Sequence, residues 1–419
     1  MDKIIISGGK PLCGEVIISG AKNAALPILT ATLLSSEPQY LKRVPNVVDL
    51  FTLKKLLRTM GAEITDQNDL CAISVKQITS CEAQYEWVKT MRATVLVLGP
   101  LLARCGEAHV SLPGGCAIGV RPVNLHLSAL SQMGAEILVE HGMIHAKVKK
   151  LKGCAIHFET STVTGTENIM MAATLADGTT TLTNSAMEPE IIDLACFLNG
   201  CGAKITGAGT ETIVIEGVSR LTGSSYSIMP DRIETGTLMA AAAITGGDLN
   251  LRDCVPDHLA SVTRLFKKMG IKIISGKSSL RVQRPKASLM RAADFITAPY
   301  PGFPTDMQAQ MMALLSVSDG VSKITEAVFE SRFAHAAELR RMGAKIYLEG
   351  SHAIVEGVQK LSGAQVMASD LRASSSLILA GLSAEGETEI SRVYHLDRGY
   401  ERIEEKLSKV GADIKRVHG

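Results

Sequence analysis

One short stretch of the chain combines a thiol, a guanidinium and a backbone rich in glycine. Residues 111–125 read Ser-Leu-Pro-Gly-Gly-Cys-Ala-Ile-Gly-Val-Arg-Pro-Val-Asn-Leu. Three glycines and two prolines cannot sustain a helix or a central strand, so we predict an irregular, mobile loop. Cys116 has only small neighbours, unlike a cysteine packed in a core, which favours a reactive thiol. A glycine-rich turn with an incidental thiol is the alternative.

Positively charged side chains stand near the starts of several predicted helices. Lysine or arginine there opposes the helix dipole and is disfavoured unless an anion compensates it. The positions are Lys22, Arg92, Arg121, Arg232, Arg372 and Arg398. A surface position or a local salt bridge would explain any one of them. If the helix starts converge on one cleft, these cations meet there and an anion would compensate them.

Composition excludes some classes of function. The length of 419 residues suggests two domains. Because 46% of the residues are hydrophobic but only 4% are aromatic, the core must be aliphatic. The net charge of +2, with no basic run, excludes a nucleic-acid footprint. Any anionic ligand must therefore meet a local cluster of cations.

The cysteines and the apolar segments indicate the compartment. Nine cysteines include no C-x-x-C pair, and an odd number cannot all be bridged internally, so we predict reduced, cytosolic thiols. The apolar run at the N-terminus is too short for a signal peptide, and the run at 93–103 is too short to span a membrane. We expect a cytoplasmic protein without membrane insertion. The ten histidines form no ligand-spaced set with the cysteines, so no metal site is predicted.

The helices and strands that must position these residues belong to a unit that occurs six times in the sequence. A phrase of the type Met-Gly-Ala-Glu-Ile recurs, with steps of 73 residues from Gly61 to Gly134 and 68 residues from Gly134 to Gly202. The later copies carry Gly270, Gly343 and Gly411. Six copies at a nearly constant period are an internal repeat. Each phrase ends an amphipathic helix, with the glycine as its C-cap, and begins a strand.

A second, more apolar helix precedes the amphipathic one in each repeat. These segments are 24–34, 94–103, 169–176, 235–244, 307–317 and 374–382, and their apolar character predicts burial. Each repeat therefore contains a strand, a buried helix, a strand, an outer helix and further strands. The sequence predicts an α/β fold with three such subdomains in each of two domains. If the three subdomains surround an approximate threefold axis, the helix starts converge on one cleft.

Several segments together resemble the UDP-N-acetylglucosamine 1-carboxyvinyltransferase family of enolpyruvyl transferases. They are Ser19–Pro27, Lys89–Ala93, Leu112–Pro122, Pro230–Gly236, Phe303–Gln310 and His395–Tyr400. The resemblance runs from end to end. It implies two inside-out α/β domains of three repeats around a pseudo-threefold axis, made of residues 1–21 with 230–419 and of residues 22–229, the latter carrying the Cys116 loop.

The resemblance implies transfer of the enolpyruvyl group of phosphoenolpyruvate to the 3′-hydroxyl of UDP-N-acetylglucosamine. This addition–elimination releases phosphate and is the first committed step of peptidoglycan precursor synthesis. Cys116 would deliver a proton to carbon 3, and Asp306 would act as the base near the sugar hydroxyl. Lys22, Arg121 and Arg398 would hold phosphoenolpyruvate, with support from Arg92 and Arg372. Nothing in the sequence requires an organic cofactor, and we infer no obligate protein partner.

The family's contacts to the nucleotide sugar can be carried over residue by residue. Uridine contacts fall on Arg121, Pro122, Val123, Asn124 and Leu125, diphosphate contacts on Thr160, Ser161, Thr162 and Val163, and sugar contacts on Asn23, Asp306 and Val328. Many relatives carry aspartate in place of Asn124 and a basic residue in place of Thr160. The diphosphate would then rely on hydroxyl and backbone N–H groups.

Two alternatives stay open from the sequence. 5-Enolpyruvylshikimate-3-phosphate synthase shares the repeats and the chemistry but uses another acceptor; against it stand the cysteine-bearing loop and the Ala-Lys-Asn sequence at 21–23. A catalytically silent repeat scaffold is the second alternative. The protonation state of Cys116 is also open, because nearby cations favour a thiolate that cannot donate a proton. The resemblance predicts selective alkylation of Cys116 by an epoxide such as fosfomycin.

Overall fold

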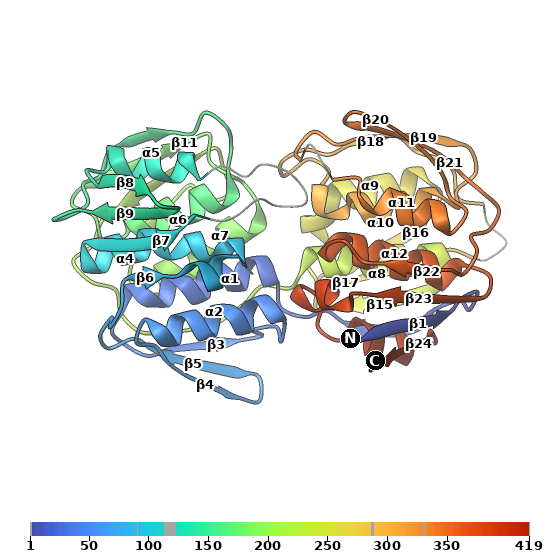
Figure 1. The fold of residues 1–419 in the computed structure, drawn as a ribbon, viewed down its shortest axis with the longest axis horizontal. Coiled ribbons are helices and arrows are strands. Elements are labelled where there is room, and N and C mark those ends of the chain that lie inside the picture. Colours follow the sequence, from blue (N-terminus) through green and yellow to red (C-terminus); the bar gives the residue numbers. More distant parts are fainter. Residues whose placement is uncertain (1, 90, 113–122, 286–288, 330–331, 419) are drawn as a thin grey trace. The chain divides into compact units, whose positions relative to one another are not determined.

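The computed structural model describes residues 2–89, 91–112, 123–285, 289–329 and 332–418. These residues form two compact units (Figure 1). One unit contains residues 2–19 and the described residues from 230 onward, and the other contains the described residues of 20–229. The chain leaves the first unit near residue 19 and returns to it near residue 230. The predicted domain limits, after residues 21 and 229, remain a prediction.

Three four-stranded sheets make up the outside of the unit formed by residues 20–229. The first has the order β14 (Ser224–Ser227), β3 (Gln39–Lys42), β5 (Leu70–Ser74), β4 (Glu63–Gln67). The second has the order β6 (Glu82–Ala83), β7 (Glu107–Ser111), β9 (Met143–Lys147), β8 (Glu136–Glu140). The third has the order β10 (Ala155–His157), β11 (Thr179–Thr183), β13 (Thr212–Glu216), β12 (Lys204–Thr206).

The other unit repeats the same arrangement. Its sheets have the orders β2 (Cys13–Ile17), β15 (Asp248–Arg252), β17 (Ser279–Gln283), β16 (Lys272–Ser275); β18 (Phe295–Ile296), β19 (Val321–Thr325), β21 (His352–Glu356), β20 (Lys345–Glu349); and β22 (Gln365–Met367), β23 (Glu387–Ser391), β1 (Lys3–Ser7), β24 (Asp413–Val417). In all six sheets the first pair is parallel and the other two pairs are antiparallel. The predicted repeat is therefore confirmed.

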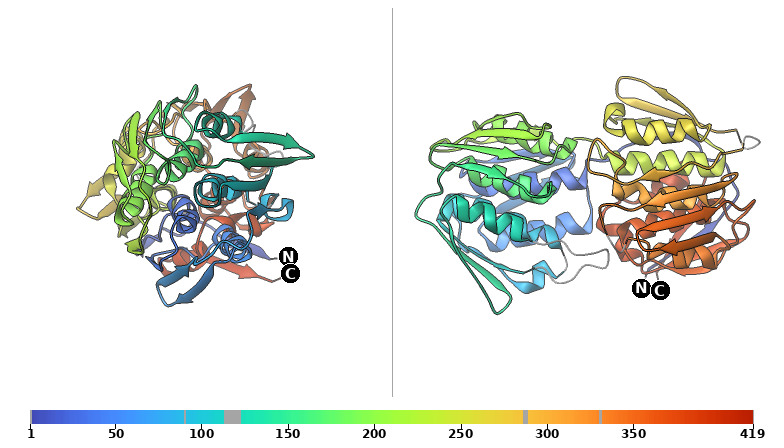
Figure 2. Two further views of the ribbon diagram at one scale, coloured as in Figure 1. Left: turned by 90° about the vertical axis from the view of Figure 1, so that its left-hand side faces the viewer. Right: turned by 90° about the horizontal axis from the view of Figure 1, so that it is seen from above.

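The helices occupy two positions in each repeat. The inner helices are α1 (Lys22–Ala31), α4 (Leu98–Cys105), α6 (Val163–Ala173), α8 (Arg232–Thr245), α10 (Gln308–Leu315) and α12 (Leu371–Ser383). The outer helices are α2 (Val48–Thr59), α5 (Asn124–Gln132), α7 (Pro189–Gly200), α9 (Ala260–Lys268), α11 (His335–Arg341) and α13 (Ile403–Lys409). The inner helices pack together inside each unit and the sheets lie outside (Figure 2), which confirms the inside-out α/β fold.

The predicted glycine C-caps are confirmed in all six repeats. Gly61, Gly134, Gly202, Gly270, Gly343 and Gly411 have φ between +87° and +105°, a left-handed conformation that favours glycine. After Gly61, the N–H of Ala62 donates to the carbonyl of Leu57, and the equivalent bond recurs after the other five glycines. These are Schellman caps, which end the helix and start the next strand.

Two inner helices begin later than predicted, because a 3₁₀ turn precedes each one. The segment expected at 94–103 is η2 (Arg92–Val97) followed by α4, and that at 307–317 is η4 (Thr305–Met307) followed by α10. Pro100 lies in the first turn of α4, where its missing N–H costs no helical bond. Short additional helices are α3 (Tyr85–Val88), η1 (Thr32–Leu34), η3 (Pro256–Leu259) and η5 (Val393–Arg398). No helix in the described ranges is both long and apolar enough to cross a membrane.

Candidate active site

Asp306 lies at the centre of a cluster of charged side chains in the unit that contains residues 230–418. Arg332 Nη2 donates to Asp306 Oδ1 at 2.7 Å, and Arg372 Nη2 donates to Asp306 Oδ2 at 2.7 Å. Each arginine side chain is only 6% exposed, whereas that of Asp306 is 26% exposed. The carboxylate therefore faces the surface side of the cluster and the two guanidiniums are buried behind it.

The two arginines fix the charge of Asp306. Burial raises the pKa of this carboxyl, but Arg372 and Arg332 outweigh burial and hold the pKa well below its usual range. Asp306 is therefore an ionised carboxylate with both oxygens occupied by guanidinium N–H groups. To accept a proton from a substrate hydroxyl, it must first lose part of this compensation.

The positions of two inner helices explain how Arg372 reaches Asp306. Asp306 lies in η4 at the start of one inner helix, and Arg372 is the second residue of α12, another inner helix that packs against α10. Asp370 caps α12 by accepting hydrogen bonds from the N–H groups of Arg372 and Ala373. Convergence of the inner helix starts therefore brings Asp306 and Arg372 together, as predicted within this unit.

A buried glutamate organises the loop that follows β19. Glu326 is 3% exposed and accepts hydrogen bonds from Thr297 Oγ1 at 2.7 Å and Thr305 Oγ1 at 2.9 Å. It also accepts the backbone N–H of Val328 at 2.9 Å. Arg332 Nη1 donates to Thr305 Oγ1 at 2.8 Å. Val328, a predicted sugar contact, is thus joined to Asp306 through one continuous network.

Tyr400 extends the same network on its other side. Arg372 Nη1 donates to Tyr400 Oη at 3.2 Å, and Tyr400 Oη shares a 2.8 Å hydrogen bond with Thr237 Oγ1. Arg398, the predicted ligand of phosphoenolpyruvate, is the last residue of η5, two positions before Tyr400. Arg398 contributes to the lowered pKa of His395, which burial depresses first. Arg232 lies over the ring of Tyr300 at 5.7 Å.

Lys22 is the first residue of α1 in the unit formed by residues 20–229. Its Nζ lies 2.6 Å from Asp49 Oδ2, and the two side chains are 10% and 5% exposed. Asp49 belongs to the first turn of the outer helix α2, so the protein itself supplies an anion for this cation. Asn23 follows on α1 and is half-buried. Arg92 begins η2, which packs against α1 and α6.

The predicted nucleotide contacts lie on two neighbouring helix starts of this unit. Val123 precedes α5, which Asn124 and Leu125 begin. Thr160 and Ser161 precede Thr162, whose Oγ1 accepts the Gly165 N–H as the cap of α6, and Val163 is the first helical residue.

His126 joins these two helix starts. Its Nε2 lies 3.3 Å from Thr164 Oγ1, and its Nδ1 lies 3.0 Å from Asn168 Nδ2. Burial lowers the pKa of His126 to about 4, so the imidazole is neutral. It therefore acts as a hydrogen-bonding spacer that fixes α5 against α6 without adding charge.

Three buried glutamates occupy the starts of α6 and α7. Glu188 precedes α7 and Glu190 lies in its first turn, while Glu167 lies on α6. Burial, reinforced by Glu190 and Glu188, raises the pKa of Glu167 well above its ordinary value. Glu167 is therefore held in its neutral form. Glu167 carries no local sequence signal, because the two glutamates that act on it lie more than 20 residues further along the chain.

Some predicted residues lie outside the described ranges, and some of the cluster was missed. Cys116, Arg121 and Pro122 fall within 113–122, which the structure does not describe. Arg332, Glu326 and Tyr400 were not among the predicted site residues. Arg332 stands before an outer helix, so the signal that singled out Lys22 and Arg372 would have found it too. Glu326 has no comparable signal, because its partners are distant in the sequence.

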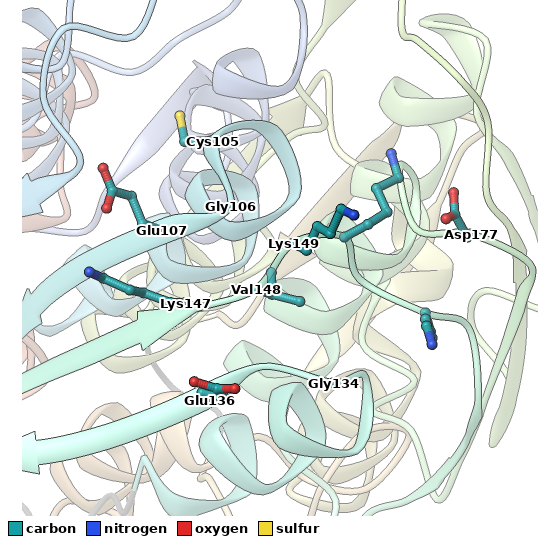
Figure 3. A pocket seen from close by; sticks show the side chains of 11 residues that line it. Cys105, Gly106, Glu107, Gly134, Glu136, Lys147, Val148, Lys149 and Asp177 are labelled. Atoms are coloured by element: carbon teal, nitrogen blue, oxygen red, sulfur yellow. The ribbon is translucent and has the colours of Figure 1, made fainter.

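A surface hollow of about 840 Å³ in the unit of residues 20–229 contains none of the predicted site residues (Figure 3). Its lining includes Lys147, Lys149, Lys150 and Lys152 together with Glu107, Glu136 and Asp177. Opposite charges are mixed along it. The hollow is therefore distinct from the side chains described above.

Comparisons with known proteins agree with the fold. A profile of the family EPSP synthase (3-phosphoshikimate 1-carboxyvinyltransferase) matches residues 6–407. Proteins curated as UDP-N-acetylglucosamine 1-carboxyvinyltransferase from Geobacter metallireducens, Thermodesulfovibrio yellowstonii and Magnetococcus marinus are each 56% identical to this chain, with 100% of both sequences covered.

Solved structures extend the comparison. The enolpyruvyl transferase NikO from Streptomyces tendae is 26% identical, with a TM-score of 0.90 over 100% of this chain and 99% of that chain. EPSP synthase from Acinetobacter baumannii shares the fold at 19% identity, with a TM-score of 0.77 over 100% of both chains. The resemblance inferred from the sequence is thereby confirmed: the chain belongs to the EPSP synthase family of carboxyvinyltransferases, within the group of UDP-N-acetylglucosamine 1-carboxyvinyltransferases.

Proposed function

We propose that this protein transfers the enolpyruvyl group of phosphoenolpyruvate to the 3′-hydroxyl of UDP-N-acetylglucosamine and releases phosphate. The observation that carries the proposal is the 56% identity, over the whole chain, to relatives that bear the name of this activity. The reaction would supply a precursor of peptidoglycan, in the cytoplasm. Both substrates are anionic, so the chain must offer several cations to them.

Lys22, Arg92, Arg121, Arg372 and Arg398 are the cations we assign to the substrates. Arg372 shares the Asp306 carboxylate with Arg332 in the structure, and Lys22 is paired with Asp49. An arriving phosphate or carboxylate would compete with these protein carboxylates for the same N–H groups. The internal carboxylates keep the buried cations hydrogen-bonded until the substrate arrives.

This competition supplies a role for Asp306 as the base. When a substrate anion takes over part of the charge of Arg372, less positive charge stabilises the Asp306 carboxylate, and its pKa rises. A base of higher pKa accepts the proton of the attacking 3′-hydroxyl more readily. Binding of the anionic substrate would thus activate the base that the subsequent addition needs.

Cys116 is the residue we assign to protonation of carbon 3 during addition. The two steps need a proton delivered as the hydroxyl attacks carbon 2 and a proton removed as phosphate leaves. We expect Cys116→Ser to abolish turnover and Cys116→Asp to retain some activity, because a carboxyl group can carry the same proton. An epoxide such as fosfomycin should label Cys116 selectively among the nine cysteines.

The deciding experiment offers phosphoenolpyruvate with each of two acceptors and measures released phosphate. Phosphate released with UDP-N-acetylglucosamine, and not with shikimate 3-phosphate, supports the proposal. The reverse preference would identify a 5-enolpyruvylshikimate-3-phosphate synthase instead. Full activity in Cys116→Ser would remove the role of Cys116 without affecting the assignment of the substrates. No release with either acceptor, together with no thermal stabilisation by UDP-N-acetylglucosamine, would favour a silent scaffold.

A further inference from the structure

Two histidines face each other across neighbouring strands, in a sheet that carries none of the residues assigned to the reaction. His109 on β7 is directly opposite His145 on β9 in an antiparallel pair. Their Nδ1 atoms are 2.9 Å apart, and their ring centroids are 5.1 Å apart. The two histidines are 36 positions apart in the sequence, so a search for closely spaced metal ligands does not find the pair.

Both imidazoles lie on the outer face of the sheet. Ala108 and Val110 flank His109, Ile144 and Ala146 flank His145, and all four neighbours are fully buried against the inside of the unit. Side chains alternate between the faces of a strand, so the two histidines point outward. The His109 side chain is 29% exposed, which leaves it accessible to a small ion from solvent.

A carboxylate stands behind one of the rings. Glu107, two residues earlier on the same face of β7, has Oε2 at 3.9 Å from His109 Nε2. This placement favours the tautomer that carries its proton on Nε2 and leaves the lone pair of Nδ1 directed at His145. The usual support of a metal-binding histidine is a hydrogen bond from its second nitrogen to a carboxylate, and a small movement of the Glu107 side chain from 3.9 Å would form one.

The separation of the two nitrogen atoms matches a chelated metal ion. With metal–nitrogen bonds of about 2.0–2.1 Å, nitrogen atoms 2.9 Å apart subtend an angle of about 90° at the ion. Tetragonal ions such as Cu²⁺ and Ni²⁺ prefer that angle, whereas tetrahedral Zn²⁺ prefers a wider one. We propose that His109 and His145 form a chelating site for a tetragonal late transition-metal ion, with Glu107 as a positioning residue.

The chemistry of the pair permits this without loss of a proton. In the absence of an ion, one Nδ1 donates its hydrogen to the other. Binding moves the donor's proton through solvent to its own Nε2 and turns the two rings, so that both Nδ1 lone pairs converge on the ion. No group of three or more His, Cys, Asp or Glu side chains among the described residues is placed to hold a metal ion. Water therefore completes the coordination, and affinity is moderate.

The surrounding charges favour a cation at this face. Glu107, Lys147 and Glu136 lie across from one another on β7, β9 and β8, so the one lysine stands between two carboxylates (Figure 3). On the other side, Glu82 of β6 pairs in register with His109. In register on these strands the histidine pair has three carboxylates and one lysine around it, whereas Lys149, Lys150 and Lys152 lie beyond the end of β9.

Calorimetric titration of the full chain with Ni²⁺ tests the proposal, after its thiols have been blocked with N-ethylmaleimide. We expect His109→Asn and His145→Asn each to weaken the strongest site by at least about tenfold, because a single remaining imidazole cannot chelate. Glu107→Gln should weaken it by roughly tenfold, the usual effect of losing a supporting carboxylate. His157→Gln and His352→Asn are matched controls, since each is a strand histidine hydrogen-bonded to a threonine; they should leave the titration unchanged.

A measurement on the unmodified histidines makes the proposal independent of the variants' folding. Electron paramagnetic resonance of one equivalent of Cu²⁺ on the thiol-blocked wild type should show two coordinated imidazole nitrogens. Ni²⁺ affinity that is unchanged in both folded asparagine variants, or a Cu²⁺ spectrum without two imidazole nitrogens, would overturn the assignment.

Discussion

Among single side chains, Arg332 is the most informative to replace. It lowers the pKa of Asp306 but is not assigned to either substrate, so its loss should change the charge state of Asp306 without removing a substrate contact. It contacts Asp306 Oδ1 and Thr305 but was not assigned to a substrate. In Arg332→Gln, the pKa of Asp306 should rise, because one of the two cations that lower it is gone. If Asp306 is the base, kcat/KM falls as pH drops through that pKa, so the acidic limb of the profile should move to higher pH.

The control is Arg341→Gln, whose side chain is 59% exposed, pairs with Glu338 and donates to the carbonyl of Gln365. Its pH profile should match that of the wild type. An acidic limb that stays in place in Arg332→Gln would show that Asp306 does not set it. The free energy of unfolding reports the same lowered pKa of Asp306. Above about pH 4, the usual pKa of an unfolded aspartate, the ionised carboxylate stabilises the folded protein. This stabilisation is lost as pH falls through the folded-state pKa. Asp306→Asn should lack that component of acid destabilisation in urea unfolding.

Lys22 and Asp49 allow a structural role to be separated from a chemical one. Removing one partner of a buried ion pair leaves the other charge uncompensated, at a cost of about 3–5 kcal/mol. Lys22→Ala should therefore lose both stability and turnover. The double variant Lys22→Ala with Asp49→Asn should regain most of the stability, in urea unfolding, without regaining turnover. Recovery of both properties together would mean that Lys22 is needed only to neutralise Asp49.

At the scale of helices and strands, the glycine that caps each outer helix gives a test of backbone strain. The cleanest position is one where an added Cβ would meet no neighbouring atom. Gly343 has φ +92° and nothing within 4 Å of a built Cβ, so Gly343→Ala should cost about 1–2 kcal/mol from left-handed strain alone. Gly61 has φ +100°, but there a Cβ would lie 2.5 Å from the carbonyl oxygen of Gln77. Gly61→Ala should therefore cost more. Equal losses in thermal or urea unfolding would contradict this distinction.

Sequence periodicity predicted these elements because the signals are local. The repeated glycines mark the caps, and apolar segments such as 235–244 mark the inner helices, whose residues are buried throughout α8. The 3₁₀ starts at Arg92 and Thr305 were not predictable in the same way. Whether the first turn of a helix is 3₁₀ or α depends on the backbone that precedes it. The apolar pattern of the sequence is the same in both cases, so it does not distinguish them.

Across the whole molecule, the candidate site was predictable only in part. Cations at helix starts conflict with the helix dipole, and that local conflict drew attention to Lys22 and Arg372 before any contact was known. Their compensating partners, Asp49 and Asp306, are 27 and 66 residues away in the sequence and become neighbours only through packing. Glu326 and the His109–His145 pair were missed for the same reason. Their partners lie on other strands or loops, so only strand register and loop packing reveal them.

The position of the N-terminal strand β1 leads to one further prediction. β1, formed by Lys3–Ser7, is a central strand between β23 and β24, so the last sheet contains both ends of the described chain. Ile4 and Ile6 of β1 are fully buried in the core of that unit. Deleting residues 1–7 should therefore unfold the sheet, because β23 and β24 would lose the ladder between them and the core would lose two isoleucines.

A shorter deletion provides the matched control for β1. Removing residues 1 and 2 spares the strand and should cost little, since the contacts of Asp2 are with the partly or fully exposed Arg416 and His418. Circular dichroism and urea unfolding of the two truncated proteins would separate these outcomes. If the protein without residues 1–7 keeps wild-type stability, β1 is dispensable for the last sheet. If only that deletion destabilises, the N-terminal strand completes the final repeat, and the three repeats of this unit do not fold as independent modules.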